Sequence, residues 1–149
     1  MIDTLTPEAR SRNMSRIRGK NTKPELVVRR ILRSTGVGYR LHVKALPGCP
    51  DIVMAGRRRI IEVRGCFWHR HPGCRFAYEP KTRQEFWNTK LEANVARDRQ
   101  NEAILSEKGW HVLVIWECEI RDLGALRERI SCFLEIDPTN CHPAAIAKV

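Results

Sequence analysis

The stretch Pro50-Asp-Ile-Val-Met-Ala-Gly-Arg-Arg-Arg-Ile-Ile-Glu-Val-Arg64 predicts a β-hairpin that carries two acidic side chains on one face. Gly56-Arg57 suits a two-residue type II′ turn, which requires glycine first, between strands at 51–55 and 58–64. That register sets Asp51 directly opposite Glu62. Like charges facing each other about 5 Å apart destabilise a sheet unless a cation lies between them. We therefore expect Asp51 and Glu62 to bind Mg²⁺.

The same alternation of side chains places Arg64 on the face of Asp51 and Glu62. The carbonyl oxygen of Val63 and water molecules would complete an octahedral magnesium site. Arginine stays protonated at physiological pH and cannot act as a general base, so we expect Arg64 to stabilise charge on a phosphate. The alternative is that the two carboxylates are simply neutralised by neighbouring arginines.

The next segment has the composition of a zinc-binding loop. Cys66, His71 and Cys74 have the short, irregular spacing of zinc ligands, which must point from a tight loop at one metal. The fourth ligand must come from elsewhere in the chain. Cys118, at the end of a later apolar strand, is the preferred candidate, and Cys49 is the chief alternative.

Two adjacent aromatic residues, Phe67 and Trp68, lie between these ligands and are flanked by arginines. This mixture is typical of surfaces that contact phosphates and insert apolar side chains between bases. Consecutive residues of an extended segment cannot easily face the same interior, so we expect both to contact DNA. The alternative is ordinary burial in the core, the commoner position of aromatic residues.

The bulk composition favours a polyanionic partner. The chain has 149 residues and a formal net charge of +10, which suits nucleic acid, although it would also suit an anionic membrane surface or solubility alone. No apolar run reaches the roughly 18 residues of a membrane span, and residues 1–18 lack the apolar region of a signal peptide. We expect a cytoplasmic, reduced protein whose cysteines bind metal or are buried as thiols.

The chain divides into three parts: a basic N-terminal arm at 1–20, a central domain at 21–136 and a tail at 137–149. The arm is expected to be helical, with Arg16 and other arginines around the apolar Met14. Few helices this polar bury a face. We expect the arm to cross phosphates and present Met14 as an apolar wedge; the alternative is a solvated, disordered terminus.

The order of elements in the central part predicts an α/β domain with a mixed sheet and helices on both sides. Thr22 caps a first helix, with Glu25 at the capping-box position, which gives Glu25 a structural explanation. A second capping box at Thr82 opens a long helix that ends near Lys108. Lys90 and Asn94 on that helix are candidates for DNA contacts, against the alternative of a solvated face. The other elements are strands at 37–43 and 110–116, the latter central, and a helix at 123–136.

Pro50-Asp51, ten intervening residues and Glu62-Val63-Arg64 resemble the core of PD-(D/E)XK nucleases, with arginine in place of lysine. Together with the blocks Gly65-Cys-Phe-Trp-His69, Glu85-Phe-Trp87 and Trp116-Glu-Cys118, the chain resembles the very-short-patch (Vsr-type) mismatch repair endonucleases over residues 8–135. The resemblance implies a restriction-endonuclease-like fold with one structural zinc site.

The resemblance also implies roles for single residues. Asp51 and the carbonyl of Val63 match magnesium-binding positions, His69 matches a catalytic histidine, and Glu25 matches an acid that holds a water on the metal. Met14, Phe67 and Trp68 match an intercalating wedge. The zinc ligands match at Cys66, His71, Cys74 and Cys118, with one extra residue between the second and third.

The chain departs from the family pattern at Glu62 to Arg64, where an apolar residue, a small residue and histidine are usual. Glu62 adds an acidic ligand, and proton transfer falls to His69. The implied activity is magnesium-dependent nicking of double-stranded DNA at T·G mismatches on the strand with the T, by a monomer in the bacterial cytoplasm at the nucleoid, with mismatch-sensing repair proteins as partners. The alternatives are a restriction-type nuclease that cuts matched DNA and a non-catalytic zinc-containing DNA-binding protein.

Overall fold

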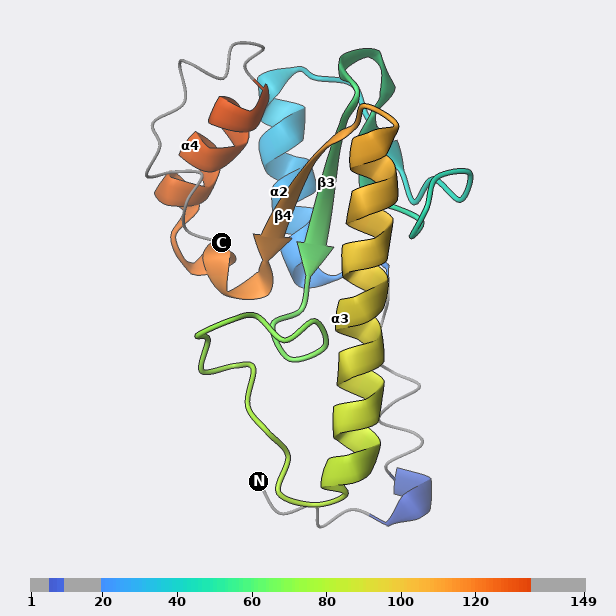
Figure 1. Ribbon diagram of the computed structural model, residues 1–149. Coiled ribbons are helices and arrows are strands. Elements are labelled where there is room, and N and C mark those ends of the chain that lie inside the picture. The colour runs from blue at the N-terminus through green and yellow to red at the C-terminus, as the bar shows by residue number, and fades with distance from the viewer. Residues whose placement is uncertain (1–5, 10–19, 135–149) are drawn as a thin grey trace.

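The computed structural model describes residues 6–9 and 20–134 and consists of a four-stranded mixed sheet with helices on both faces (Figure 1). The strand order is β1-β2-β3-β4, in which β3 and β4 are parallel and the other pairs are antiparallel. A parallel pair needs a long crossover, which α3 supplies. The predicted α/β class is therefore confirmed. The elements are α2 (Lys23–Thr35), β1 (Arg40–Leu41), β2 (Ile52–Met54), η1 (Ala55–Arg57), β3 (Arg59–Arg64), α3 (Gln84–Glu107), β4 (His111–Trp116), η2 (Glu117–Arg121) and α4 (Leu123–Leu134).

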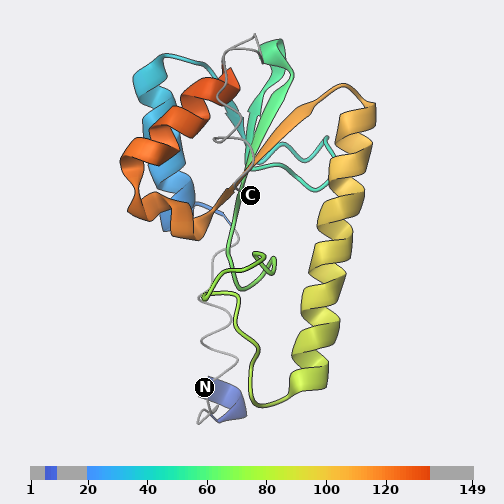
Figure 2. The same cartoon turned by 60° about the vertical axis from the view of Figure 1, so that its left-hand side comes forward.

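Helices α2 and α4 cover one face of the sheet and α3 covers the other (Figure 2). Ile61 of β3 packs in the cluster shared with α2 and α4, whereas its neighbour Ile60 packs in the cluster that includes Leu105 of α3. Because side chains alternate along a strand, Glu62 and Arg64 share the face of Ile60. The end of β3 thus presents its charged residues to α3.

The hairpin has the predicted register but a different turn. Val53 lies opposite Ile60, so Asp51, one residue before β2, comes opposite Glu62. The connection is a four-residue turn in which the N–H of Arg58 donates to the Ala55 carbonyl at 3.1 Å. The predicted type II′ turn is wrong, because Arg58 takes the left-handed conformation (φ 52°) that glycine was expected to supply. Strand β2 is two residues shorter than predicted and β3 is one residue shorter, and the register is unchanged.

The first strand is much shorter than the predicted range of 37–43. His42 has φ 48°, a left-handed conformation that ends the extended backbone after β1. As a result Leu41 packs on the side of α2 and α4, while Val43 packs on the opposite side. A regular strand over 37–43 would place both side chains on one face, and the kink at His42 is the reason why they separate.

The helix ends follow the predictions only in part. Thr22 caps α2, since its Oγ1 accepts from the N–H of Glu25 at 3.3 Å, and Gly36 ends that helix at φ 78°. Helix α3 instead begins after Arg83, which is left-handed and has no side-chain cap, so the predicted capping box at Thr82 is wrong. In its first turn Phe86 is 44% exposed.

Strand β4 was predicted to be central, but it lies at the end of the strand order in the described part of the chain. Its apolar sequence is explained by the helices that cover both of its faces. Most of the predicted arm, including Met14 and Arg16, and the predicted tail lie outside the described residues. Among residues 6–9 and 20–134, no helix is long and apolar enough to cross a membrane.

Candidate active site and metal centre

Three side chains gather where α2 begins and where β1 and β2 lie side by side. The ligand atoms of Glu25, His42 and Asp51 all lie within 4.8 Å of one another. Glu25 is 2% exposed, and its Oε1 lies 2.8 Å from Nε2 of His42. The structure thus brings together Glu25 and Asp51, both selected from the sequence, and adds His42, which was not selected.

The other oxygen of Glu25 is held by its own end of the helix. Oε2 accepts from the backbone N–H of Asn21 at 3.0 Å and from Nη1 of Arg29 at 3.3 Å. Glu25 therefore satisfies a backbone donor near the helix start, although at Asn21 and not at the cap residue. Since Oε2 is occupied in this way, Oε1 is the oxygen that faces His42.

Asp51 is a buried carboxylate with no permanent positive charge among the groups that set its pKa. Burial raises the pKa of Asp51 to about 6; the N–H of Val63, 2.8 Å from Oδ2, opposes this rise, and the charges of Glu25 and Glu62 add to it. His42 has an opposing effect. A divalent cation would stabilise the ionised form that burial disfavours, and the oxygen and nitrogen donors of the cluster fit such an ion.

Glu62 lies in a different environment on the face of α3. Its Oε2 accepts from Nη2 of Arg64 at 2.5 Å, and the same nitrogen lies 2.6 Å from Oε1 of Glu102 on α3. Arg64 is 8% exposed. Burial lowers the pKa of Arg64, but Glu62, Asp98 and Glu102 together raise it above its ordinary value. Arg64 is therefore a permanent cation that links β3 to α3.

His69 follows the strand end and is paired with a residue of α3. Its Nδ1 lies 2.6 Å from Oδ2 of Asp98, and its backbone N–H donates to the carbonyl of Gly65 at 3.1 Å. A carboxylate at Nδ1 fixes the proton on that nitrogen and leaves Nε2 to exchange a proton with another molecule. The arrangement is that of an oriented general acid or base.

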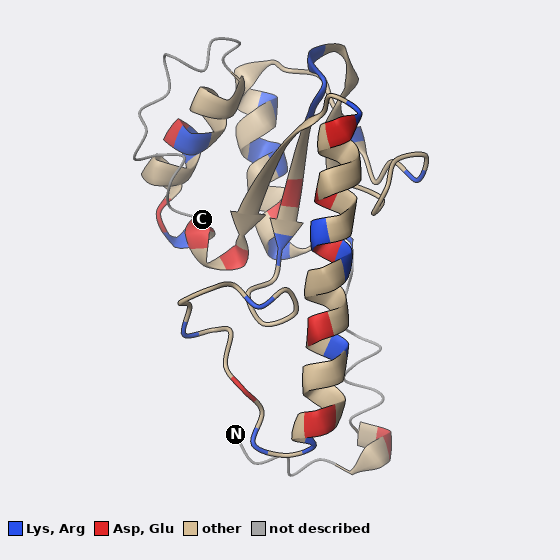
Figure 3. Ribbon diagram, viewed as in Figure 1, with Lys and Arg blue, Asp and Glu red and all other residues tan. Residues whose placement is uncertain are grey.

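One face of α3 connects these groups. Four polar residues at intervals of four form one row along the helix: Lys90, Asn94, Asp98 and Glu102. Nδ2 of Asn94 donates to the Trp68 carbonyl at 3.0 Å, so the row contacts the backbone of Trp68, the side chain of His69 and the side chain of Arg64. Figure 3 shows the charged positions of α3 beside the end of β3 and along the loop that follows it.

The two predicted wedge residues belong to a larger aromatic cluster. The Phe67 ring lies 5.2 Å from the Trp68 ring and 5.6 Å from the Trp87 ring, and it stacks on Tyr78 at 5.0 Å. Tyr78 is 46% exposed. Nζ of Lys90 lies 5.5 Å from the centre of the Trp68 ring. The cluster is a partly exposed aromatic surface beside a cation, so Phe67 and Trp68 are not ordinary core residues.

The four predicted zinc ligands are close together. The ligand atoms of Cys66, His71, Cys74 and Cys118 lie within 4.8 Å of one another, and Nδ1 of His71 is 3.6 Å from Sγ of Cys66 and 3.5 Å from Sγ of Cys118. Zn–S bonds of about 2.3 Å and Zn–N bonds of about 2.0 Å at tetrahedral angles give an S···N separation of about 3.5 Å. The donor set therefore fits a tetrahedral zinc ion.

Neighbouring groups hold this cluster in place. The His71 ring stacks on Trp116 with centroids 4.2 Å apart, and the N–H of Cys66 donates to Glu117 Oε1 at 3.0 Å. Burial raises the pKa of the Cys66 thiol to about 12, and a bound cation would favour the thiolate. Within the described residues the fourth member of the cluster is Cys118, and Cys49 is not part of it.

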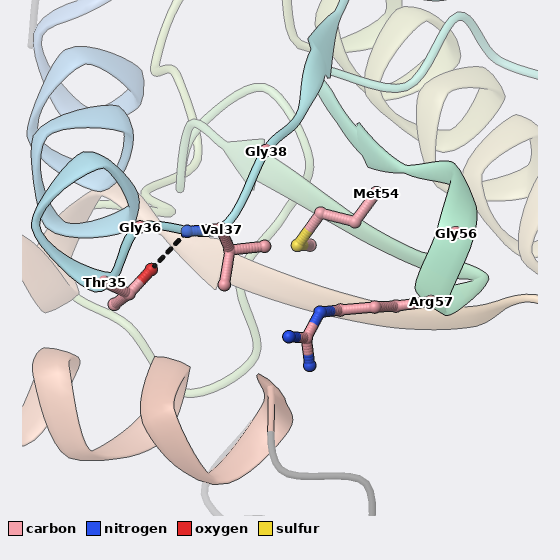
Figure 4. A pocket seen from close by; sticks show the side chains of 7 residues that line it. All are labelled: Thr35, Gly36, Val37, Gly38, Met54, Gly56 and Arg57. Carbon is pink, nitrogen blue, oxygen red and sulfur yellow. Dashed lines mark hydrogen bonds between the residues drawn. The ribbon is translucent and has the colours of Figure 1, made fainter.

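A shallow pocket lies at the other end of the sheet, between the end of α2 and the β2–β3 turn (Figure 4). The one titratable side chain among its lining residues is Arg57, whose Nη1 donates to the carbonyl of Leu134 at 3.1 Å. Apart from the hydroxyl of Thr35, the lining residues include no nucleophile and no acid. Its lining residues are Thr35, Gly36, Val37, Gly38, Met54, Gly56 and Arg57.

Two polar residues of the site were missed from the sequence. His42 was read as part of an alternating strand, and Asp98 was passed over among the charged residues of a long helix. The four-residue spacing from Lys90 through Asn94 to Asp98 was a usable signal for the second. For His42 the sequence gave no comparable pattern, because its position depends on the left-handed backbone.

Comparison with known proteins identifies the family. A family model described as DNA mismatch endonuclease Vsr matches residues 2–75. The type II nicking enzyme V.XorIIP of Xanthomonas oryzae pv. oryzae is 51% identical over 135 residues, which cover 91% of this chain and 98% of that protein. The chain belongs to the Vsr family. The DNA mismatch endonuclease Vsr of Escherichia coli K12 is 40% identical over 121 residues, covering 81% of this chain and 77% of that protein.

This Vsr-family protein is therefore a DNA endonuclease, as the resemblance implied. A structural neighbour, the catalytic domain of the homing endonuclease I-Bth0305I, matches with a TM-score of 0.51 at 24% identity. The match covers 76% of this chain and 94% of that domain, and it supports the nuclease-like fold.

Proposed function

We propose that this Vsr-family endonuclease is magnesium-dependent and nicks double-stranded DNA at T·G mismatches, on the strand that carries the T. The observation that carries the proposal is the cluster of the buried Glu25 with the partly buried His42 and Asp51, whose ligand atoms lie within 4.8 Å of one another, in a chain of net charge +10. A non-catalytic DNA-binding protein would have no use for these buried acids. Action as a monomer in the bacterial cytoplasm, with mismatch-sensing partners, is part of the same proposal.

In this proposal Asp51 is the principal magnesium ligand, with the carbonyl of Val63. Glu62 is a weaker ligand, because one of its oxygens is already bound by Arg64 at 2.5 Å. Glu25 holds a water molecule of the site with the oxygen that faces His42. A bound magnesium ion would supply charge neutralisation to the phosphate and activate water for attack on it.

His69 moves the proton in the proposed reaction. Asp98 holds Nδ1 at 2.6 Å, so Nε2 is the nitrogen that exchanges a proton with the water or the leaving oxygen. Arg64 keeps its positive charge between Glu62 and Glu102 and stabilises negative charge on the phosphate electrostatically. The zinc ion proposed at Cys66 would keep the loop that carries His69 in one conformation.

Recognition of the substrate is assigned to the aromatic cluster and the row on α3. In the proposal Phe67 and Trp68 enter the duplex, as does Met14 of the N-terminal arm. Inserting such wedges costs a few kcal/mol of stacking per step, and less at a mismatch. Arg16, Lys90 and Asn94 are the proposed DNA contacts. The relative from Escherichia coli is named a mismatch endonuclease, which supports this substrate.

The proposal is tested by nicking of a labelled duplex that contains one T·G pair, compared with the same duplex with T·A, with and without magnesium. We expect nicking only of the T·G duplex, only of the strand with the T, and only with magnesium present. Equal cleavage of the T·A duplex would indicate a restriction-type nuclease. Binding without cleavage under every condition would indicate a non-catalytic protein.

A further inference from the structure

His42 is tied to both acids of the cluster. Its backbone N–H donates to the Asp51 carbonyl at 3.0 Å, and its Nε2 lies 2.8 Å from Oε1 of Glu25. Its side chain is 14% exposed. The left-handed backbone (φ 48°) ends strand β1 and is the point from which the imidazole contacts Glu25. The imidazole is thus placed at the proposed metal site by both its backbone and its side chain.

The separation of these donor atoms suits a shared ion. Two ligands at right angles on an octahedral ion, with bonds of about 2.1 Å, lie about 3.0 Å apart. The 2.8 Å between Nε2 of His42 and Oε1 of Glu25 is close to that distance. Asp51 supplies a third donor within 4.8 Å, so the three side chains can bind one cation with two oxygens and one nitrogen. In the proposed magnesium site Oε1 of Glu25 holds a water molecule; when the ion is bound by His42, the same oxygen binds the ion directly.

A nitrogen donor changes which cation is preferred. Magnesium prefers oxygen ligands and gains little from imidazole, whereas manganese and later transition ions accept both. We propose that His42 is a direct metal ligand, so that the site which uses Mg²⁺ in the proposed function also accepts Mn²⁺ and binds it more tightly than Mg²⁺. The inference rests on the proposed function only in requiring that Asp51 binds a divalent ion.

The test is a titration of Mn²⁺ into the full-length, zinc-loaded protein, followed by electron paramagnetic resonance. We expect one Mn²⁺ site whose spin-echo modulation shows a coordinated imidazole nitrogen. His42→Gln can keep a hydrogen bond to Glu25 while removing that nitrogen. It should abolish the modulation and weaken Mn²⁺ binding by about tenfold or more, while Mg²⁺ affinity, measured by competition, changes less than about threefold.

The matched control is His111→Gln, which makes the same change at an exposed position at the start of β4 and should leave both affinities unchanged. Equal weakening of Mn²⁺ and Mg²⁺ by His42→Gln would overturn the proposal, because His42 would then act only by holding Glu25. Retention of the nitrogen modulation in that variant would also overturn it. Asp51→Asn in the same titration tests the metal site itself, so a failure of the proposed function is recognised separately.

Discussion

Asp51 and Glu62 come opposite each other in the hairpin, yet their surroundings differ in one respect that decides their chemistry. Glu62 is paired at 2.5 Å with Arg64, which also contacts Glu102. Asp51 accepts a backbone N–H, and among the described groups that shift its pKa, His42 is the one whose charge lowers it. Burial raises the pKa of both acids. The register of a hairpin thus identifies a pair of acids. Their neighbouring side chains determine which of the two has no paired cation and is available to bind a metal ion.

The largest expected effect comes from replacing Asp51, the acid of the pair that does not contact Arg64. Asp51→Asn should lower the rate of nicking of a T·G duplex by about 10³-fold. Mutation of a residue that only hydrogen-bonds to a metal ligand already lowers metal affinity or activity by about 10–100-fold, and loss of the ligand itself should cost more. Glu62→Gln, the matched change across the hairpin, should cost only about tenfold. Single-turnover nicking rates measure both. Duplex binding should persist in each variant because neither change removes a positive charge. Equal losses would mean that the two acids are equivalent ligands.

The second test removes the cation that compensates Glu62. Arg64→Gln should lower the free energy of unfolding by about 3 kcal/mol, because it leaves the buried Glu62 without its partner. Urea unfolding measures this change, and Arg30→Gln at an exposed position of α2 is the control. Adding Glu62→Gln to Arg64→Gln should recover part of the loss. If the single variant is as stable as the wild type, the arginine does not compensate Glu62.

The smallest expected effect is the contribution of Asp51 to the pH dependence of the free energy of unfolding. A carboxyl group whose pKa is higher in the folded protein, here about 6, stabilises the fold below its unfolded pKa, and this stabilisation is lost as the pH rises through 6. Without added divalent ions, we expect the wild type to lose about 1 kcal/mol relative to Asp51→Asn between pH 5 and pH 7. Urea unfolding at both pH values measures it. Magnesium at pH 7 should reverse the loss in the wild type only.

The parts that the sequence predicted correctly depend on short-range patterns. Alternation fixed the register of Val53 with Ile60 and hence the positions of Asp51 and Glu62. Residue chemistry identified Cys66 and its three partners, since few other side chains bind a tetrahedral metal. These patterns depend on a few neighbouring residues or on ligand type, so they are visible before folding.

The parts that were missed depend on single backbone conformations and on tertiary packing. The left-handed residues His42, Arg58 and Arg83 have side chains that usually avoid positive φ, and each one changed the end of an element. The pairing of Asp98 with His69 requires that a loop and a helix lie side by side, which no local pattern reports. The sequence therefore predicted the acids of the site but not the groups that orient them.

Trp68 and His69 are consecutive, and both are fastened to the same row of α3, one through Asn94 and the other through Asp98. These two anchors are one helical turn apart, about 6 Å along the axis. A displacement of the Trp68 indole should therefore also displace the imidazole of His69 next to it. In the proposed function, sensing of the lesion by Trp68 and proton transfer by His69 would therefore be coupled, because a duplex that excludes the indole would also leave the imidazole out of position.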